Sequence, residues 1–303
     1  MRSIPDVLVL GGGGRQGDAW MSGVLAGLED AREISFADCE YLLGTSAGSI
    51  VAAKLASGRR LKRPDPDNEA ESVADGGTQA ESEPERECEP LPEALLASAL
   101  RLVEPFTGAG LLLATLPGEL ARGAALAMVP TSAVETLDFA AAFPPEKISF
   151  DGRLRMAAVE RSRGRRVIFG APDAAPATVA QALRASCALP LVFGPTRIGE
   201  HDYFDGALWS PTNADAAPAS RGSEVLILAP MASHHGPFLK AVRVASRALL
   251  LVEAAALRGH GAKVELITPD RASAHAIGAD LMAADGLDAT LAAGYRQGLH
   301  LAA

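Results

Sequence analysis

Two strand–turn–helix units follow one another at the start of the chain, and each turn consists of glycine and other small residues. The first unit joins the apolar run 7–10 to a helix over 18–30 whose apolar residues recur at helical spacing. The second joins a strand over 40–43 to a helix over about 47–57. Strands that alternate with helices in this way form a parallel sheet covered by helices, which excludes an all-β or an all-helical fold.

The remaining chain continues this pattern with one interruption. Alternating residues on either side of a Ser-Arg-Gly turn predict a β-hairpin over 153–170. The predicted fold is therefore α/β with three layers, α/β/α, and a mostly parallel central sheet. The other elements that we expect are a short helix over 177–188, irregular chain through 203–211, a strand over 224–230, a long helix ending near 258, a strand over 263–269 and one terminal helix.

Charge is distributed unevenly along the 303 residues. The net charge is -9, but residues 64–93 hold eleven acidic residues and one arginine, so the rest of the chain is close to neutral. A face that binds nucleic acid requires clustered basic residues, and we expect none. We predict one domain over 1–303 that carries an acidic, disordered insert at 58–92, because this segment has almost no large apolar residue, and a helical lobe at 93–143.

The cysteines and the apolar segments bear on location. Cys39, Cys88 and Cys187 are widely spaced, which predicts free thiols in a reducing compartment. The first ten residues lack a cleavage-type site and predict a strand instead of a signal peptide. Charged residues and Pro117 interrupt the apolar stretches 110–129 and 241–257, so neither predicts a membrane span. We therefore expect a cytoplasmic protein with peripheral membrane contact.

The first glycine-rich turn allows two interpretations. Gly12, Gly14 and Gly17 satisfy G-x-G-x-x-G after a strand, and Asp38 or Glu40 follows at a distance suited to a ribose contact. This pattern is typical of a dinucleotide site. Alternatively, the bare backbone amides could bind an oxyanion that forms during an acyl-transfer reaction.

The second turn favours the oxyanion. Residues 44–48, G-T-S-A-G, match G-x-S-x-G between a strand and a helix, which is the context of a nucleophilic serine. Small residues permit a sharp turn that exposes Ser46, and the following helix directs its N-terminal amides toward the same point. A helix cap formed by Thr45 or Ser46 is the alternative without chemistry. With Ser46 as the nucleophile, the amides of Gly12, Gly13, Gly14 and Ala47 would form the oxyanion hole.

The base is less evident from the residues alone, since Asp205-Gly206 in a loop most often forms a turn. The combination is more specific. G-G-G-x-x-G over 12–17, G-T-S-A-G, A-S-C-A-L-P-L-V-F-G-P from residue 185, and D-G-A at 205–207 together resemble the patatin-like phospholipase family, from residue 7 to about 216. This resemblance implies a patatin-like fold, Ser46 as nucleophile and Asp205 as its direct base, with no histidine between them.

The same resemblance implies a lipid or other acyl-ester substrate, hydrolysis of its carboxylic ester bond, and neither cofactor nor metal. The chain departs from the family in the glycine loop. The family often carries Arg or Lys immediately before the last glycine, where this chain has Gln16 after Arg15. The stretch 17–23 is also one residue longer than the family leads us to expect.

Three other functions remain open on the sequence alone. A Ser-His-Asp hydrolase would use His234, His235 or His260, which follow Asp205 in the usual order, although its serine would normally follow several strands. A scaffold that binds lipid without turnover and a nucleotide-dependent oxidoreductase are the other two.

Two segments bear on substrate access. The apolar helices of 93–143 would either cover the site as a lid or form ordinary core. The hairpin arginines would either contact anionic headgroups or form a solvated edge; they are Arg153, Arg155, Arg161, Arg163, Arg165 and Arg166.

Overall fold

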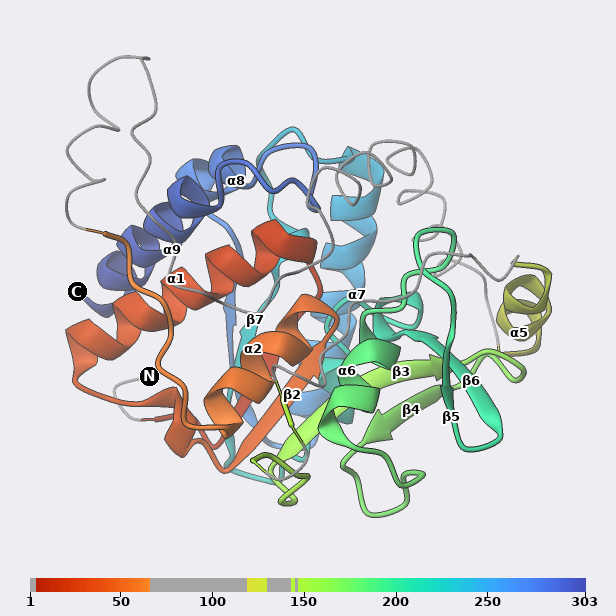
Figure 1. Ribbon diagram of the computed structural model, residues 1–303. Helices are drawn as coiled ribbons and strands as arrows, with labels where there is room; N and C mark the ends of the chain where they lie inside the picture. Colours follow the sequence, from red (N-terminus) through yellow and green to blue (C-terminus); the bar gives the residue numbers. More distant parts are fainter. Residues whose placement is uncertain (1–3, 66–118, 130–142, 145–146) are drawn as a thin grey trace.

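The structure is a computed structural model that describes residues 4–65, 119–129, 143–144 and 147–303. In this part of the chain eight strands form one sheet (Figure 1): β1 (Val7–Leu10), β2 (Tyr41–Thr45), β3 (Leu154–Glu160), β4 (Arg166–Phe169), β5 (Thr196–Ile198), β6 (His201–Asp205), β7 (Glu224–Leu228) and β8 (Lys263–Ile267). The strand order is β5-β6-β3-β2-β1-β7-β8, and β4 also pairs with β3.

Most of the sheet is parallel, as predicted. Strands β3, β2, β1, β7 and β8 run in one direction, whereas β4, β5 and β6 run antiparallel to their neighbours. All four residues of β1 are buried, because the sheet is covered on both faces. Leu8 and Leu10 point into the core on one face, and Val7 and Val9 point into the core on the other.

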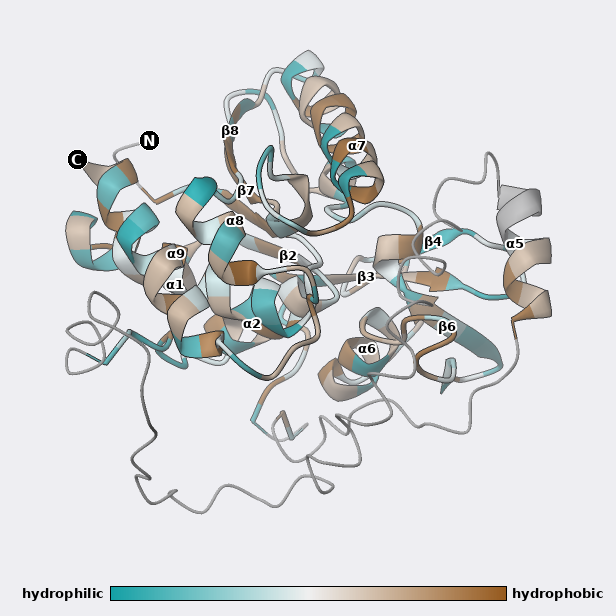
Figure 2. Cartoon of the chain, turned by 90° about the horizontal axis from the view of Figure 1, so that it is seen from above, coloured by the Kyte–Doolittle hydropathy of each residue, from teal (hydrophilic) through white to brown (hydrophobic). Residues whose placement is uncertain are grey.

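Helices cover the two faces unequally (Figures 1 and 2). One face carries α1 (Gly14–Arg32), α2 (Ala47–Ala56), α6 (Val179–Ser186), α8 (Arg271–Ile277) and α9 (Leu287–Ala302). The opposite face carries α7 (Lys240–Gly259) and α5 (Glu119–Met128). The result is the predicted three-layer α/β/α arrangement. Among the described connections, four contain a short 3-10 helix, at Phe36–Asp38, Gly206–Leu208, Ala214–Ala216 and Pro230–Ala232.

Helices α1 and α9, which are far apart in the sequence, pack closely against each other. A Cβ added at Gly23 or Gly27 of α1 would lie 2.2 or 2.3 Å from a carbonyl oxygen of α9, and one added at Gly294 or Gly298 of α9 would lie 2.5 or 2.3 Å from a carbonyl oxygen of α1. These glycines let the two backbones approach closely, and α9 thereby holds the C-terminal segment beside the first helix.

The structure confirms most of the predicted elements and corrects three. The hairpin of β3 and β4 forms as expected, with Val159 opposite Arg166. The segment predicted as irregular contains a second hairpin, β5 and β6, which turns at Gly199. The predicted terminal helix is two helices, α8 and α9, and α1 begins at Gly14, one turn earlier than expected.

The predicted insert and lobe lie mostly outside the described residues, which lack 66–118 and 130–142. The first part of the insert, 58–65, packs against the domain: Leu61 is buried, and Arg63 forms ion pairs with Asp30 at 2.7 Å and with Glu29 at 3.3 Å. Of the lobe, α5 is described, and Leu126 packs against the sheet. Within the described ranges, no helix is both long enough and apolar enough to cross a membrane.

Candidate active site

Ser46 occupies a sharp turn between the end of β2 and the start of α2. Its φ of 52° and ψ of -123° are strained for a residue with a side chain. The turn is tight because a Cβ at Gly44 would lie 2.3 Å from Ser49 Cα, and one at Gly48 would lie 2.0 Å from the Leu10 carbonyl oxygen. The two outer glycines of the motif are therefore required by close packing, and they lift Ser46 out of the strand.

Asp205 is brought to Ser46 by the strand that lies between β2 and β6. Thr45, the last residue of β2, is opposite Ala157 of β3, and Asp205, the last residue of β6, is opposite Ala158. Both strands thus end beside the same point of β3. The Ser46 side chain lies next to the Asp205 carboxyl group, and Oδ1 of that group accepts a hydrogen bond from the Ala207 N–H at 2.8 Å.

Burial controls the charge of this carboxyl group. Asp205 is 2% exposed, and desolvation raises its pKa to about 7, although the Ala207 N–H and the neighbouring Ser46 side chain act in the opposite direction. Near neutral pH the group therefore exchanges between its neutral and charged forms. A buried carboxyl group in this state can accept a proton and return it.

The glycine-rich turn lies directly against Ser46 and Asp205. A Cβ at Gly12 would lie 3.4 Å from Ser46 Cβ and 3.7 Å from Ala207 Cβ. However, the Gly12 N–H donates to the Pro211 carbonyl oxygen at 2.8 Å, so it is not free to bind an oxyanion as the sequence led us to expect. No hydrogen bond among the described residues uses the N–H groups of Gly13, Gly14 or Ala47, which begin α1 and α2.

A cavity of about 600 Å³ opens over these groups. Its walls are largely apolar, and they come from segments that are far apart in the sequence. They include Ile50, Leu189, Val192, Phe193, Met231, Phe238, Leu239, Leu281 and Met282. Among the charged residues of the lining, Asp18 forms an ion pair with Lys54 at 3.0 Å. The volume and the apolar walls suit a ligand with an acyl chain.

Comparison with known proteins identifies the family. The sequence profile described as patatin-like phospholipase matches residues 8–218, which is more than half of the chain. The chain belongs to the patatin-like phospholipase family. The family match includes the turn of Ser46 and the strand end of Asp205, and it stops before α7, α8 and α9. No curated protein matches the chain in sequence.

Two solved structures of bacterial proteins are similar to this patatin-like chain. VipD from Legionella pneumophila is 13% identical with a TM-score of 0.44; the match covers 99% of this chain and 67% of VipD. The ExoU–SpcU complex of the Pseudomonas aeruginosa type III secretion system is 20% identical with a TM-score of 0.38; the match covers 98% of this chain and 51% of the matched chain. The chain thus spans about half the length of the latter.

The departure from the patatin-like pattern at Gln16 has a structural explanation. Gln16 is 1% exposed, and its side-chain amide donates to the carbonyl oxygens of Ala283 at 3.1 Å and Asp285 at 2.8 Å. Its Oε1 accepts from the Thr290 hydroxyl at 2.6 Å. Gln16 therefore fastens the glycine-rich turn to the C-terminal segment, including Leu281 and its neighbours in the cavity wall.

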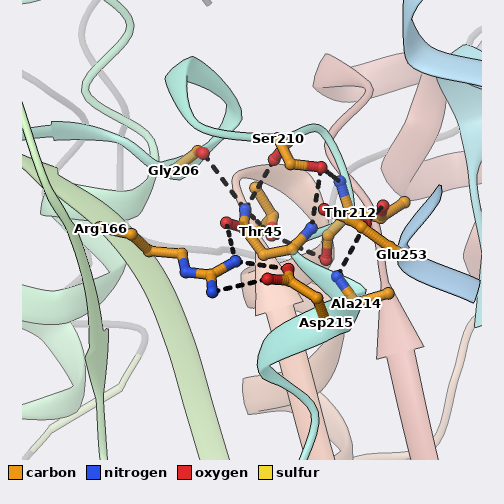
Figure 3. Close-up of polar contacts among 9 residues, drawn as sticks. Thr45, Arg166, Gly206, Ser210, Thr212, Ala214, Asp215 and Glu253 are labelled. Carbon is orange, nitrogen blue, oxygen red and sulfur yellow. Dashed lines mark hydrogen bonds and ion pairs between the residues drawn. The ribbon is translucent and has the colours of Figure 1, made fainter. Parts of the chain in front are cut away.

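A buried polar network fixes the chain that follows Asp205 (Figure 3). The Asn213 side-chain amide donates to Thr45 Oγ1 at 3.1 Å, to the Gly206 carbonyl oxygen at 3.2 Å and to the Ser210 carbonyl oxygen at 2.6 Å. It thus connects the residue before Ser46 to the residue after Asp205. Sequence reasoning missed this residue, because an Asn in a polar loop gives no local signal of such contacts.

Glu253 of α7 belongs to the same network (Figure 3). Its carboxylate accepts from the Thr212 hydroxyl at 2.5 Å and from the Ala214 N–H at 2.9 Å, and burial raises its pKa. Beside it, Arg166 of the hairpin forms a bidentate ion pair with Asp215. These contacts hold the loop between Asp205 and β7 in one position.

Two of the alternatives from the sequence lose their structural basis. Asp38 and Glu40 precede β2 and therefore lie at the opposite edge of the parallel sheet from the glycine-rich turn, so they cannot complete a dinucleotide site there. A Cβ at Gly14 would lie 2.4 Å from the Leu281 carbonyl oxygen, so that segment covers the start of α1. No histidine is among the described residues that line the cavity, so none of the three considered for a triad lies in that lining.

Proposed function

We propose that this protein hydrolyses acyl esters of lipids, with Ser46 as the nucleophile and Asp205 as its base. The observation that carries this proposal is the position of Ser46 beside the buried Asp205 carboxyl group, in the lining of one largely apolar cavity. Membership of the patatin-like phospholipase family supports a lipid hydrolase. The arrangement also fits the general pattern of a nucleophile that contacts its base directly.

In the first half-reaction the acyl chain of the substrate occupies the cavity, and the ester carbonyl carbon lies next to Ser46 Oγ. As Oγ attacks this carbon, its proton moves to Asp205. The carbonyl oxygen becomes an oxyanion, and the N–H groups of Gly13, Gly14 and Ala47 donate to it. The positive ends of α1 and α2 stabilise the same charge.

The intermediate then collapses, the bond from the carbonyl carbon to the alcohol oxygen breaks, and Asp205 returns its proton to that oxygen. A water molecule attacks the acyl-Ser46 ester in the second half-reaction, and Asp205 takes a proton from the water. Release of the fatty acid returns this proton to Ser46 Oγ. The enzyme regains its starting state, and one ester bond has been exchanged for an acid and an alcohol.

The raised pKa of Asp205 favours this chemistry. A carboxylate with its ordinary pKa of about 3.9 is a weak base toward a hydroxyl group. A pKa of about 7 makes the carboxylate a stronger base toward the Ser46 hydroxyl, and much of the group is still charged near neutral pH. The apolar walls exclude water, which strengthens the hydrogen bonds to the oxyanion.

The same reasoning supports one acyl hydrolase domain over 1–303, because the segments beyond the family match contribute to the cavity. We retain 58–92 as an acidic insert and 93–143 as a lobe of that domain. We also propose a cytoplasmic enzyme that contacts membranes peripherally.

Covalent labelling tests this proposal directly. A fluorophosphonate should add once to the wild-type protein, and the mass of the intact protein should rise by a single adduct. Ser46→Ala should remain unlabelled, and peptide mapping should place the adduct on Ser46. Wild-type protein that is folded and stays unlabelled, or an adduct on another residue, would exclude the mechanism and leave a lipid-binding scaffold as the alternative.

A further inference from the structure

The long helix α7 exposes an apolar stripe that runs along most of its length. Val244 and Val252 are 60% and 68% exposed, and Leu251 is 46% exposed. Ala248 and Ala255 continue the same line at helical spacing. Figure 2 shows the hydrophobic colour along α7, which lies apart from α1, α2, α8 and α9.

This stripe is additional to the side of α7 that packs on the sheet. Leu250, Ala254 and Leu257 are buried against the core of the second face. The outward residues are therefore not needed to hold the helix in place. Several exposed aliphatic side chains in one row are unusual for a free surface and mark an interaction site.

The charges beside the stripe are all positive. Lys240, Arg243, Arg247 and Arg258 lie on α7, and its only acidic residue, Glu253, is buried in the network of Thr212. No ion pair between described residues involves a side chain of α7. Three of these cations donate to backbone carbonyl oxygens: Arg243 and Arg247 to those of 232, 233 and 238, and Arg258 to that of Val264. None has a carboxylate partner among the described residues, although the whole chain has a net charge of -9.

The stripe begins at the cavity. Phe238 and Leu239 immediately precede α7 and line the cavity wall, and Leu239 is 54% exposed. A ligand that covers the outer side of α7 would therefore lie next to the cavity opening at Leu239. Both the apolar stripe and the cations are in this way connected to the site of the proposed reaction.

We propose that α7 docks on an anionic lipid surface, with Val244, Leu251 and Val252 entering the interface and the exposed Lys240 and Arg258 facing the headgroups. Amphipathic helices with this combination lie in the plane of a membrane interface. A second copy of the chain fits less well, because a two-fold contact would bring two sets of these cations together. Docking through α7 would bring the cavity of the proposed hydrolase next to the lipid surface. The docking itself does not depend on the proposed hydrolysis; only this link between surface and cavity rests on it.

Vesicle sedimentation tests the docking without using the reaction. The probes are phosphatidylcholine vesicles with and without phosphatidylglycerol. Wild-type protein should bind the anionic vesicles, and added salt should weaken the binding. Val244→Glu with Val252→Glu should reduce binding about ten-fold or more, because two apolar contacts are replaced by two repelled charges.

The control makes the same change on the opposite face of the sheet. Leu299 and Leu301 of α9 are 37% and 41% exposed, so Leu299→Glu with Leu301→Glu adds equal charge at a similar apolar site. This variant should sediment with the vesicles like wild type. Turnover of a soluble short-chain ester should be unchanged in both variants, since none of the four residues lines the cavity.

Several results would overturn the proposal. Equal loss of binding in both variants would indicate an effect of net charge alone, and normal binding by the α7 variant would place the lipid contact elsewhere. Wild-type protein that is a dimer in solution, with a monomeric α7 variant, would assign the stripe to a second copy. Binding that appears only after deletion of 66–118 would mean that the chain covers its own stripe. If wild-type protein binds anionic vesicles but does not hydrolyse the soluble ester, the proposed function is rejected and the docking proposal stands.

Discussion

The cavity has two parts that differ in how they are built. The proposed catalytic part consists of turns at strand ends: the glycine-rich turn, the turn of Ser46 and the end of β6 at Asp205. Much of the wall consists of side chains from three later segments, around Phe193, Phe238 and Met282, and Ile50 of α2 and Met231 complete it. The first part determines which bond can react, and the second determines which molecule can enter. One fold can thus keep its chemistry while its substrate changes.

The largest effect is expected from a change in the catalytic part. Ser46→Ala removes the attacking oxygen, and alanine fits the same turn, so kcat on a soluble nitrophenyl ester should fall by about a thousand-fold or more. The melting temperature should change little. If folded Ser46→Ala protein keeps a kcat within about ten-fold of wild type, the chemistry does not depend on Ser46, and the turns at the strand ends are not the catalytic part.

The pH dependence should report on Asp205. Its base form is the carboxylate, which is populated above a pKa of about 7. The value of kcat/KM should therefore rise about ten-fold per pH unit below this value and level off above it. A profile that is already flat from about pH 5 upward would mean that a group with an ordinary carboxyl pKa, or none, controls the reaction.

Stability should change in the opposite direction to activity at Asp205. The folded carboxyl has a pKa of about 7, against about 3.9 in the unfolded chain, so the folded state holds the extra proton between these values. The free energy of unfolding is therefore highest, as far as this group is concerned, below pH 4 and decreases as the pH rises to 7. An amide does not titrate, so replacing the carboxyl group by an amide removes this decrease in the free energy of unfolding.

Asp205→Asn should accordingly raise the free energy of unfolding at pH 8 by up to about 4 kcal/mol, and by much less at pH 4. Urea unfolding at the two pH values measures both differences. A variant that is less stable than wild type at pH 8 would show that the charged carboxylate is stabilised in the folded protein by contacts stronger than its burial.

The smallest effect is expected from the wall. Met282→Ala enlarges the cavity beside Gly14, so KM for short acyl esters should rise a few-fold, about three- to ten-fold, with little change in kcat, and longer chains should be preferred. A series of nitrophenyl esters measures both constants. Met128→Ala is the matched control, because Met128 is exposed on α5 and does not line the cavity. Equal effects of the two substitutions would contradict a role for the wall.

The two parts also differ in how well the sequence predicts them. The position of Ser46 was predictable because its turn is local: a strand, five small residues and a helix determine it. Asp205 was not predictable from its residues alone, since Asp-Gly usually forms a turn, and the resemblance to a family supplied its role. Its place beside Ser46 depends on β3 lying between β2 and β6.

Contacts between residues that are far apart in the sequence could not be predicted from the local turn motif or from the family resemblance. The sequence offers four consecutive glycines with equivalent amides, and the carbonyl group of Pro211 decides that Gly12 does not face the oxyanion. Gln16 is bonded to residues near the other end of the chain, and Asn213 joins Thr45 to Gly206. Such contacts follow from the packing of α9 on α1 and of α7 against the loop, which brings together residues that are far apart in the sequence.

The most direct test of the Ser46–Asp205 pair is the turnover of Asp205→Asn on a soluble ester. The amide keeps the shape of the carboxyl group but cannot take the proton of Ser46. We expect kcat to fall by about a thousand-fold or more while KM changes little, and single substitutions of His201, His234, His235, His260, His275 and His300 to leave kcat unchanged. If Asp205→Asn keeps most of the wild-type kcat, or a histidine variant loses as much, Asp205 is not the base of this enzyme.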